Sequence, residues 1–283
     1  MLPSHSDRPS TPRPMMLMLC VDCGQQYDAY GQVLADQYLG SPGIRRFCPP
    51  CRDIRRRALE AESEMRRAER LAYQHEQWLN AQIPEKFREA TFETFDATGN
   101  EDRVQALREY AENFPVTKEG LKGKRSVLIA RDENGVGKTH LACAFLSRII
   151  QRTPQMDWEH CPYQFWTSYK IKHRLQAAQR FGSAETVEKV YLDFGTMWLL
   201  VLDDLGKEKA VGAEAAAAYE MYYTIINERY ERRLPMVITS NIGFQPSTPG
   251  GLSLVDLIGK AGASRLMEMC RGTEYLIAGG DRR

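Results

Sequence analysis

The feature that most constrains this chain is a glycine-rich turn between a short apolar run and a helical pattern. The apolar run predicts a strand over 126–131, and the turn that follows contains Gly135, Gly137, Lys138 and Thr139. Glycines in such a turn let backbone amides converge on anionic oxygens, and the N-terminus of the next helix adds a favourable dipole. The order of strand, turn and helix therefore indicates a phosphate-binding turn.

Two residue types in the turn have roles that phosphate binding requires. Lys138 would neutralise the β- and γ-phosphates of a nucleotide, and the Thr139 hydroxyl would ligate magnesium. The first glycine of the full pattern is absent, because Asp132 stands in its place, and the alternative is an ordinary turn and helix cap. His140 is expected to pack or cap rather than titrate. The residues predicted to contact the nucleotide here are Asn134, Gly135, Val136, Gly137, Lys138, Thr139 and His140.

Two further predicted strands end in polar side chains. The longest apolar run of the chain leads into Asp203 and Asp204, and a second run leads into Asn241. Because a buried carboxylate is costly unless it is paired or bound to a cation, Asp203 is predicted to support magnesium together with Thr139. Asp204 would act as general base on the attacking water, and Asn241 would lie beside the γ-phosphate. The alternative interpretation is two solvated turns.

Strand-like and helical patterns alternate through the second part of the chain. Such alternation predicts an α/β fold, with a parallel sheet flanked by helices on both faces and right-handed crossovers. Proline and glycine punctuate the segments. The predicted strands are 126–131, 163–167, 198–203, 236–240 and 274–277, and the predicted helices are 139–151, 168–180, 213–233 and 262–270.

Four of the seven cysteines form two closely spaced pairs. Cys20 and Cys23 are followed, after 24 intervening residues, by Cys48 and Cys51. Four thiolates complete the closed tetrahedron that structural zinc prefers, so the spacing predicts a zinc site without catalysis. The alternative is four unrelated thiols. The other three cysteines have no partner spacing and are expected to be core thiols: Cys143, Cys161 and Cys270.

Composition shifts divide the chain into four predicted parts. The first is rich in Pro, Ser and Arg and cannot bury enough apolar surface to fold alone. The third is rich in Arg, Glu and Ala, and Pro84 ends its helix because proline blocks helix continuation. The parts are a disordered tail over 1–15, a zinc-binding module over 16–52, a helical linker over 53–83 and a nucleotide-binding domain over 84–283.

Overall composition limits the possible partners. Hydrophobic residues make up 43% and charged residues 27%, which is enough apolar content for a core. The formal net charge is +1, so binding to nucleic acid has to come from a local patch. No apolar run approaches the roughly 20 residues of a membrane helix, and no export signal is evident. We therefore expect a cytoplasmic protein that does not interact with membranes.

Several motifs in combination resemble the AAA+ helicase loaders of the DnaC/DnaI type, and the related IstB transposition helpers look similar. The resemblance extends from Pro84 to the last residue. It implies an AAA+ ATPase domain over 84–283, which binds ATP and Mg²⁺. The segments that carry it are 83–88, 92–96, 135–142, 199–206, 225–230, 238–241, 264–266 and 280–283.

The resemblance also implies roles for two arginines and for the cysteines. ATP in this family lies at a subunit boundary, so Arg265 would stabilise the γ-phosphate of a neighbouring subunit, the alternative being a solvated arginine on a helix. Arg283, in the terminal motif, would sense nucleotide from within its own subunit. DnaI-like loaders carry a zinc-binding N-terminal domain for the helicase, whereas the DnaC and IstB types generally do not. The Zn²⁺ site therefore favours the DnaI-like interpretation.

The resulting hypothesis is an ATP-dependent loader that places the hexameric replicative helicase on single-stranded DNA and self-associates through its ATPase domain. Basic and aromatic residues over 169–174 and 229–233 would contact the strand, unless they are simply solvated helix faces. Hydrolysis is expected to be slow, because Asp204 is shorter than the glutamate common at its position. The rivals are an IstB-like transposition helper and a nucleotide-insensitive adaptor, for which Asp132 and Asp204 are the only support.

Overall fold

The structure is a computed structural model that describes residues 17–29, 47–130, 135–156, 161–206, 213–246 and 251–277. The chain divides into two compact units, Met1–Arg70 and Leu71–Arg283. The sequence-predicted disordered tail lies outside the described residues. No helix in the described ranges is long and apolar enough to cross a membrane.

The first unit contains a small antiparallel sheet next to the start of a long helix. Strand β1 (Leu17–Leu19) pairs with β2 (Gln26–Asp28), and helix α2 (Pro49–Gln82) follows. The helix begins earlier than the predicted linker, because prolines are tolerated in a first turn whose amides have no intrahelical acceptor. Cys51 therefore lies on the helix rather than in the loop before it.

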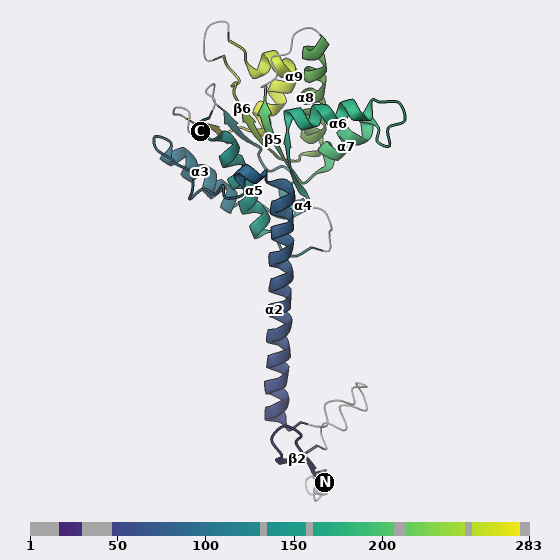
Figure 1. Ribbon diagram of the computed structural model, residues 1–283. Helices are drawn as coiled ribbons and strands as arrows, with labels where there is room; N and C mark the ends of the chain where they lie inside the picture. The colour runs from purple at the N-terminus through teal and green to yellow at the C-terminus, as the bar shows by residue number, and fades with distance from the viewer. Residues whose placement is uncertain are drawn as a thin grey trace, which may run out of the picture. The chain divides into compact units, whose positions relative to one another are not determined.

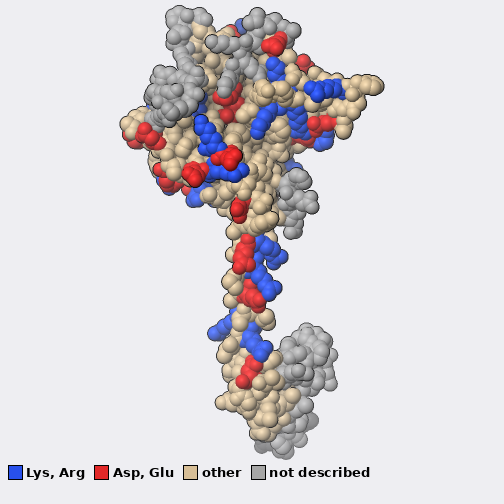
Figure 2. Space-filling model, in the orientation of Figure 1, with Lys and Arg blue, Asp and Glu red and all other residues tan. Residues whose placement is uncertain are grey.

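Helix α2 is stabilised mainly by its own side chains over most of its length. Trp78 is its one buried residue, and Figure 2 shows basic and acidic side chains next to each other along it. The predicted pair of Glu62 and Arg66 is confirmed, with 2.5 Å between carboxylate and guanidinium. Such pairs one turn apart each contribute a few tenths of a kcal/mol. The composition therefore accounts for a solvated helix.

The second unit is built around a five-stranded parallel sheet, as predicted (Figure 1). The strand order is β4-β5-β6-β3-β7, and every neighbouring pair is parallel. The predicted strands are all present, although β5 extends beyond Asp203. Their bounds are β3 Val127–Ala130, β4 Tyr163–Thr167, β5 Leu199–Leu205, β6 Met236–Ser240 and β7 Glu274–Leu276.

Helices cover both faces of the sheet, and alternate strand residues pack against different helices. Val127 and Ile129 belong to the core that contains α3 and α5, whereas Leu128 and Ala130 belong to the core that contains α6 to α9. Burial on both faces explains why these strands are continuously apolar. The helices are η2 Glu85–Phe87, α3 Glu101–Glu112, α4 Lys118–Leu121, α5 Lys138–Arg152, α6 Ser168–Ala178, α7 Val187–Thr196, α8 Ala213–Arg232 and α9 Leu254–Met269.

Among the described residues, the α-helices α3, α4 and α7 and the short 3-10 helix η2 were not predicted, and α9 is longer than predicted. Helix α7 is rich in β-branched and aromatic residues, which have weak helix propensity, so its packing decides its conformation. Helices α3 and α4 lie in a segment for which no helix was predicted. Helix α9 starts before Gly259, whose φ of 70° marks a kink that hid the periodicity. A capping box of Ser253 and Asp256 begins it.

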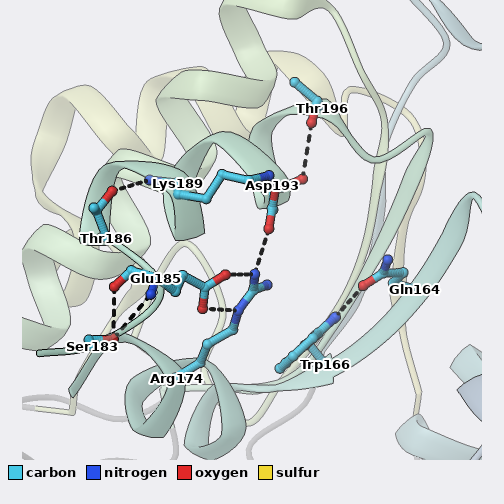
Figure 3. Close-up of polar contacts among 9 residues, drawn as sticks. All are labelled: Gln164, Trp166, Arg174, Ser183, Glu185, Thr186, Lys189, Asp193 and Thr196. Atoms are coloured by element: carbon cyan, nitrogen blue, oxygen red, sulfur yellow. Dashed lines mark hydrogen bonds and ion pairs between the residues drawn. The ribbon is translucent and has the colours of Figure 1, made fainter. Parts of the chain in front are cut away.

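A network of partly buried ion pairs joins helices α6 and α7 (Figure 3). Arg174 donates to the carboxylates of Glu185 and Asp193, and Lys189 pairs with Asp193 as well. Arg174 lowers the pKa of Glu185 through these hydrogen bonds. The Thr186 hydroxyl caps α7 by accepting from the Lys189 amide at 3.2 Å. The network therefore holds the two helices as one hairpin.

Arg229 is buried inside the second unit, which the sequence pattern did not predict. Its side chain is fully buried, and its guanidinium donates to the backbone carbonyls of Phe194 at 2.6 Å, Met197 at 2.9 Å and Pro235 at 2.6 Å. It thereby connects α7, the approach to β5 and the approach to β6. The prediction that Arg229 contacts DNA is wrong, because its donors face inward.

We expect Arg229→Ala to lower the free energy of unfolding by on the order of 3 kcal/mol, because three buried carbonyls would lose a charged donor. Urea denaturation followed by circular dichroism measures this. Glu231→Ala, an exposed substitution on the same helix, is the control and should have little effect. Equal urea midpoints of unfolding for the two variants would contradict a stabilising role of the buried Arg229 side chain.

Candidate functional site

A cavity of about 670 Å³ lies at the carboxyl ends of β3, β5 and β6. Three parts of the second unit line it, namely the glycine-rich turn with the start of α5, the ends of β5 and β6, and the segment before α3. Ligands of open parallel sheets bind at this edge. The lining residues are Lys86, Phe87, Glu89, Ala90, Thr94, Phe95, Asp96, Gly135, Gly137, Lys138, Thr139, His140, Asp203, Asp204 and Asn241.

The glycine-rich turn depends on backbone angles that side chains rarely allow. Gly135 and Gly137 have φ values of 79° and 92°. A Cβ added to Gly137 would lie 2.5 Å from Cε2 of Phe95, so the turn and this ring are in close contact. Lys138 begins α5 and is only 7% exposed. A buried ammonium group at a helix N-terminus is placed to meet an anionic ligand.

Asp203 is the central acceptor of the site. Its side chain is 4% exposed and accepts hydrogen bonds from the Thr139 hydroxyl at 3.0 Å and the Thr239 hydroxyl at 2.6 Å. These contacts join α5, β5 and β6. A hydroxyl and a carboxylate 3.0 Å apart are the hard oxygen donors that Mg²⁺ prefers, so the residues present fit this ion.

Backbone contacts around Asp204 fix the direction of the strand end. Asp204 has a φ of 61°, and the β5–β6 register shifts between Leu202 and Leu205. The Asp204 amide donates to the Thr239 hydroxyl at 2.9 Å, and the Ser168 hydroxyl donates to the Asp204 carbonyl at 3.1 Å. These two hydroxyls hold a strained conformation that directs the Asp204 side chain to the cavity.

The segment before α3 closes the cavity on the side of α5. His140 Nε2 is 2.8 Å from the Thr91 carbonyl, and its ring meets Phe95 edge-on with centroids 5.4 Å apart. His140 therefore packs against this segment while lining the cavity, as predicted for a packing residue. Thr94 lies 3.4 Å from the same ring nitrogen.

The structure gathers most of the predicted nucleotide residues around one cavity. Val136 lies in the same turn but is fully buried, so it supports the turn from behind. Arg265 lies on α9 and donates to the Tyr223 hydroxyl at 2.7 Å, outside the residues that line the cavity. Asp132, Asn134 and Arg283 lie outside the described residues. The roles assigned to all these residues stay predictions.

Sequence reasoning missed two groups at the site. The first is Thr239, whose hydroxyl touches both acidic residues of the β5 end. Two signals could have found it, namely its place two residues before Asn241 on an apolar strand and its inclusion in the segment 238–241 that carries the resemblance. The second is the lining segment from Lys86 to Asp96, which lies some forty residues before the turn in sequence. No local pattern in that segment indicates a ligand.

The four paired cysteines come together in the first unit. The sulfur atoms of Cys20, Cys23, Cys48 and Cys51 all lie within 4.8 Å of one another, and those of Cys23 and Cys48 are 3.7 Å apart. Zn–S bonds of about 2.3 Å in a tetrahedron separate the sulfurs by about 3.8 Å. The arrangement and the donor chemistry therefore fit a structural zinc ion.

The electrostatics of the cysteine cluster favour a thiolate at one position. Burial raises the pKa of Cys20, but the backbone amides of Cys48, Cys23 and Asp22 outweigh it and lower the pKa to about 6. A thiolate at neutral pH is the form that binds metal. In contrast, burial raises the pKa of Cys161 to about 12, consistent with the predicted core thiol.

Comparison with known proteins gives a family. The model of the IstB-like ATP binding protein family matches residues 59–248 of this chain. This span covers the glycine-rich turn and both strands whose ends line the cavity. A search of curated proteins finds no match.

Several solved structures are similar to this chain. The crystal structure of the DnaC helicase loader aligns with a TM-score of 0.51 and 23% identity over 69% of this chain and 100% of that one. The crystal structure of DnaI aligns with a TM-score of 0.49 and 19% identity over 71% and 94% of the two chains. Domain III of Thermotoga maritima DnaA aligns with a TM-score of 0.48 and 19% identity over 68% of each. The α/β AAA+ fold predicted from sequence is confirmed by the first.

We expect Gly137→Ala to weaken ATP binding at least tenfold, because the added Cβ would collide with Phe95 at a φ that alanine disfavours. Titration of a fluorescent ATP analogue with Mg²⁺ measures the dissociation constant. Gly182→Ala is the matched control, since Gly182 has a φ of 76° with no atom within 4 Å of its Cβ position. Unchanged affinity in Gly137→Ala would contradict the phosphate role of the turn.

We expect one zinc ion per chain in protein purified without chelator, as measured by plasma mass spectrometry. Cys20→Ser should remove it, because three thiolates hold zinc less tightly than four. Cys161→Ala, which changes a cysteine outside the cluster, should retain the metal. Substoichiometric zinc in the unaltered chain would show that the four thiols serve another purpose.

Proposed function

Because this chain belongs to the IstB-like ATP-binding protein family, we propose that it is an ATP-dependent loader of the replicative DNA helicase onto single-stranded DNA. The observation that carries the choice of partner is the four-cysteine cluster in the first unit. The likeness to the DnaC helicase loader is in agreement with this proposal. Nucleotide would control when the helicase is held and when it is released.

In this proposal, different residues of the cavity bind ATP, hold magnesium and assist hydrolysis. Lys138 neutralises phosphate charge, and Thr139 and Asp203 hold magnesium, which supplies positive charge to the phosphates when it is bound. Asp204 accepts a proton from the attacking water, and Asn241 orients that water. Asp204 reaches less far than a glutamate would, so we expect slow hydrolysis.

Arg265 would complete the site of a neighbouring subunit. Within its own chain its guanidinium lies 5.5 Å from the Tyr223 ring and 5.7 Å from the Tyr230 ring, in addition to its bond with the Tyr223 hydroxyl. These contacts pre-orient a long side chain, which lowers the entropy cost of docking it against a phosphate. Self-association through the ATPase domain would bring it to the γ-phosphate.

The four-cysteine cluster supports a helicase-binding module. A zinc site there would stabilise a segment whose described core is only a few residues, namely Cys20, Tyr27, Ala29 and Cys48 with their neighbours. The four thiolates would fill every coordination position of the zinc ion, so the role of the module would be to present a surface and not to catalyse. Loaders of the DnaI type use such a module to hold the helicase.

Single-stranded DNA would be held by the exposed side of α6. Tyr169 is 66% exposed and its ring lies 4.2 Å from that of His173, one turn further along. Lys170 is exposed beside them. An exposed aromatic pair with an adjacent cation is suited to base stacking with backbone neutralisation. The Arg174 network keeps this helix rigid.

A transposition helper of the IstB type is the second candidate. The specific observation in its favour is the family match itself, which carries the IstB name. Such a helper would use the same ATPase core to deliver a transposase. The cysteine cluster argues against it, because helpers of this type generally lack a zinc module.

The test is co-elution of the full chain with its host's hexameric replicative helicase, with and without ATP and Mg²⁺. We expect a complex whose stability depends on nucleotide, loss of that dependence in Lys138→Ala, and loss of the complex in Cys20→Ser. Lys260→Ala, which removes an exposed cation on α9, is the control.

The other outcomes separate the rivals. Identical complex formation by Lys138→Ala and the unaltered chain, with and without nucleotide, would favour a nucleotide-insensitive adaptor. Failure to bind helicase under every condition, together with binding to a transposase, would overturn the loader proposal.

A further inference from the structure

The part of α2 that belongs to the first unit carries apolar side chains that no described residue covers. Every residue from Ile54 to Arg70 is exposed. A fully solvated helix is expected to be polar on all sides, yet Ile54 is 65% exposed and Met65 is 58% exposed. Apolar side chains that line up on an exposed helix commonly mark a contact with another protein.

The apolar residues of this stretch recur with the spacing of a coiled coil. Steps of four, three, four and three positions separate them, and this average of 3.5 keeps one face of a helix turned toward a partner helix. All five side chains are exposed. They are Ile54, Ala58, Ala61, Met65 and Ala68, referred to below as the α2 seam.

The α2 seam is complementary in size to a second copy of itself that runs in the opposite direction. When Ala58 of one copy faces Ala61 of the other, Ile54 faces Met65, and each of these contacts occurs twice. The small alanines let the two helices approach closely, and the larger side chains fill the space at both ends. A two-fold axis with the same patch on both copies is the commonest symmetry of soluble dimers.

Two charged residues beside the seam have no ion pair within the described part of the chain. The ion pairs along this stretch involve Arg55, Arg56 and Arg66. Arg57 and Glu64 belong to none of them, and both are exposed. Each directly precedes a seam residue, and they are one heptad apart, so they flank the same side of the seam.

We propose that α2 pairs with α2 of a second copy of this chain as an antiparallel coiled coil. In the alignment given above, Arg57 of each copy lies opposite Glu64 of the other, so both charges are paired twice. A shift of one heptad in either direction would place Arg57 opposite Arg57 or Glu64 opposite Glu64. A parallel pair would place Glu64 opposite Glu69. Charge therefore selects one direction and one alignment.

The pairing is expected to be weak and reversible. The seam covers only about two heptads, and its alanines bury little apolar area. Ion pairs at its exposed rim make it sensitive to salt. Because Cys51 lies at the start of α2, the two four-cysteine clusters would lie at opposite ends of the paired helices. The proposal concerns a different surface from the ATPase domain and does not depend on helicase loading.

The test is a charge swap in the full chain, followed by sedimentation velocity without nucleotide over a series of protein concentrations. Arg57→Glu and Glu64→Arg each place like charges opposite one another twice. We therefore expect each to raise the dimer dissociation constant about tenfold. The two changes combined restore opposite charges in reversed positions, so the double variant should return to within about threefold of the unaltered chain.

Arg67→Glu is the matched control, because Arg67 is an exposed arginine on the side of α2 away from the seam. It should leave the dissociation constant unchanged, and far-ultraviolet circular dichroism checks that each variant keeps its helix. A monomer at every concentration, equal weakening by Arg67→Glu and Arg57→Glu, or no recovery in the double variant would each overturn the proposal. Tighter association of Glu64→Arg would also overturn it, since only parallel helices gain from pairing that position with Glu69.

Discussion

The buried carboxylate of Asp203 constrains how α5, β5 and β6 are arranged in the second unit. A carboxylate removed from water has to find hydrogen-bond donors or a cation, because desolvation otherwise costs several kcal/mol. Here Thr139 from α5 and Thr239 from β6 provide donors at 3.0 and 2.6 Å. The start of α5, the end of β5 and the end of β6 are therefore held in one arrangement.

That arrangement extends outward through backbone contacts. The Thr239 hydroxyl also accepts the Asp204 amide, so the same residue sets the positions of both acidic side chains. Far from the cavity, Arg229 joins α7 to the approaches of β5 and β6 through carbonyls. The two ends of β5 are thus fixed by different chemistry, a carboxylate at one end and a guanidinium at the other.

Much of the site could be predicted because its residues are local in sequence. The turn from Gly135 to Thr139 and the pair Asp203 and Asp204 directly follow apolar runs, and strand periodicity places such residues at one edge. The cysteine pairs are similarly local, and their sulfurs converge as predicted. Thr239 and the segment around Phe95 were not predicted, because their roles arise from contacts across more than thirty residues.

Local pattern by itself determined the glycine-rich turn, the five strands and the two cysteine pairs, since each depends on residues a few positions apart, and the alternation of strands with helices indicated the parallel class. The tertiary structure decided which polar residues work together. Arg229 and Arg233 are close in sequence, yet Arg229 is buried against backbone carbonyls and Arg233 is exposed. Burial, and hence whether a charge is a fold anchor or a ligand contact, depends on neighbours that chain folding brings from distant positions.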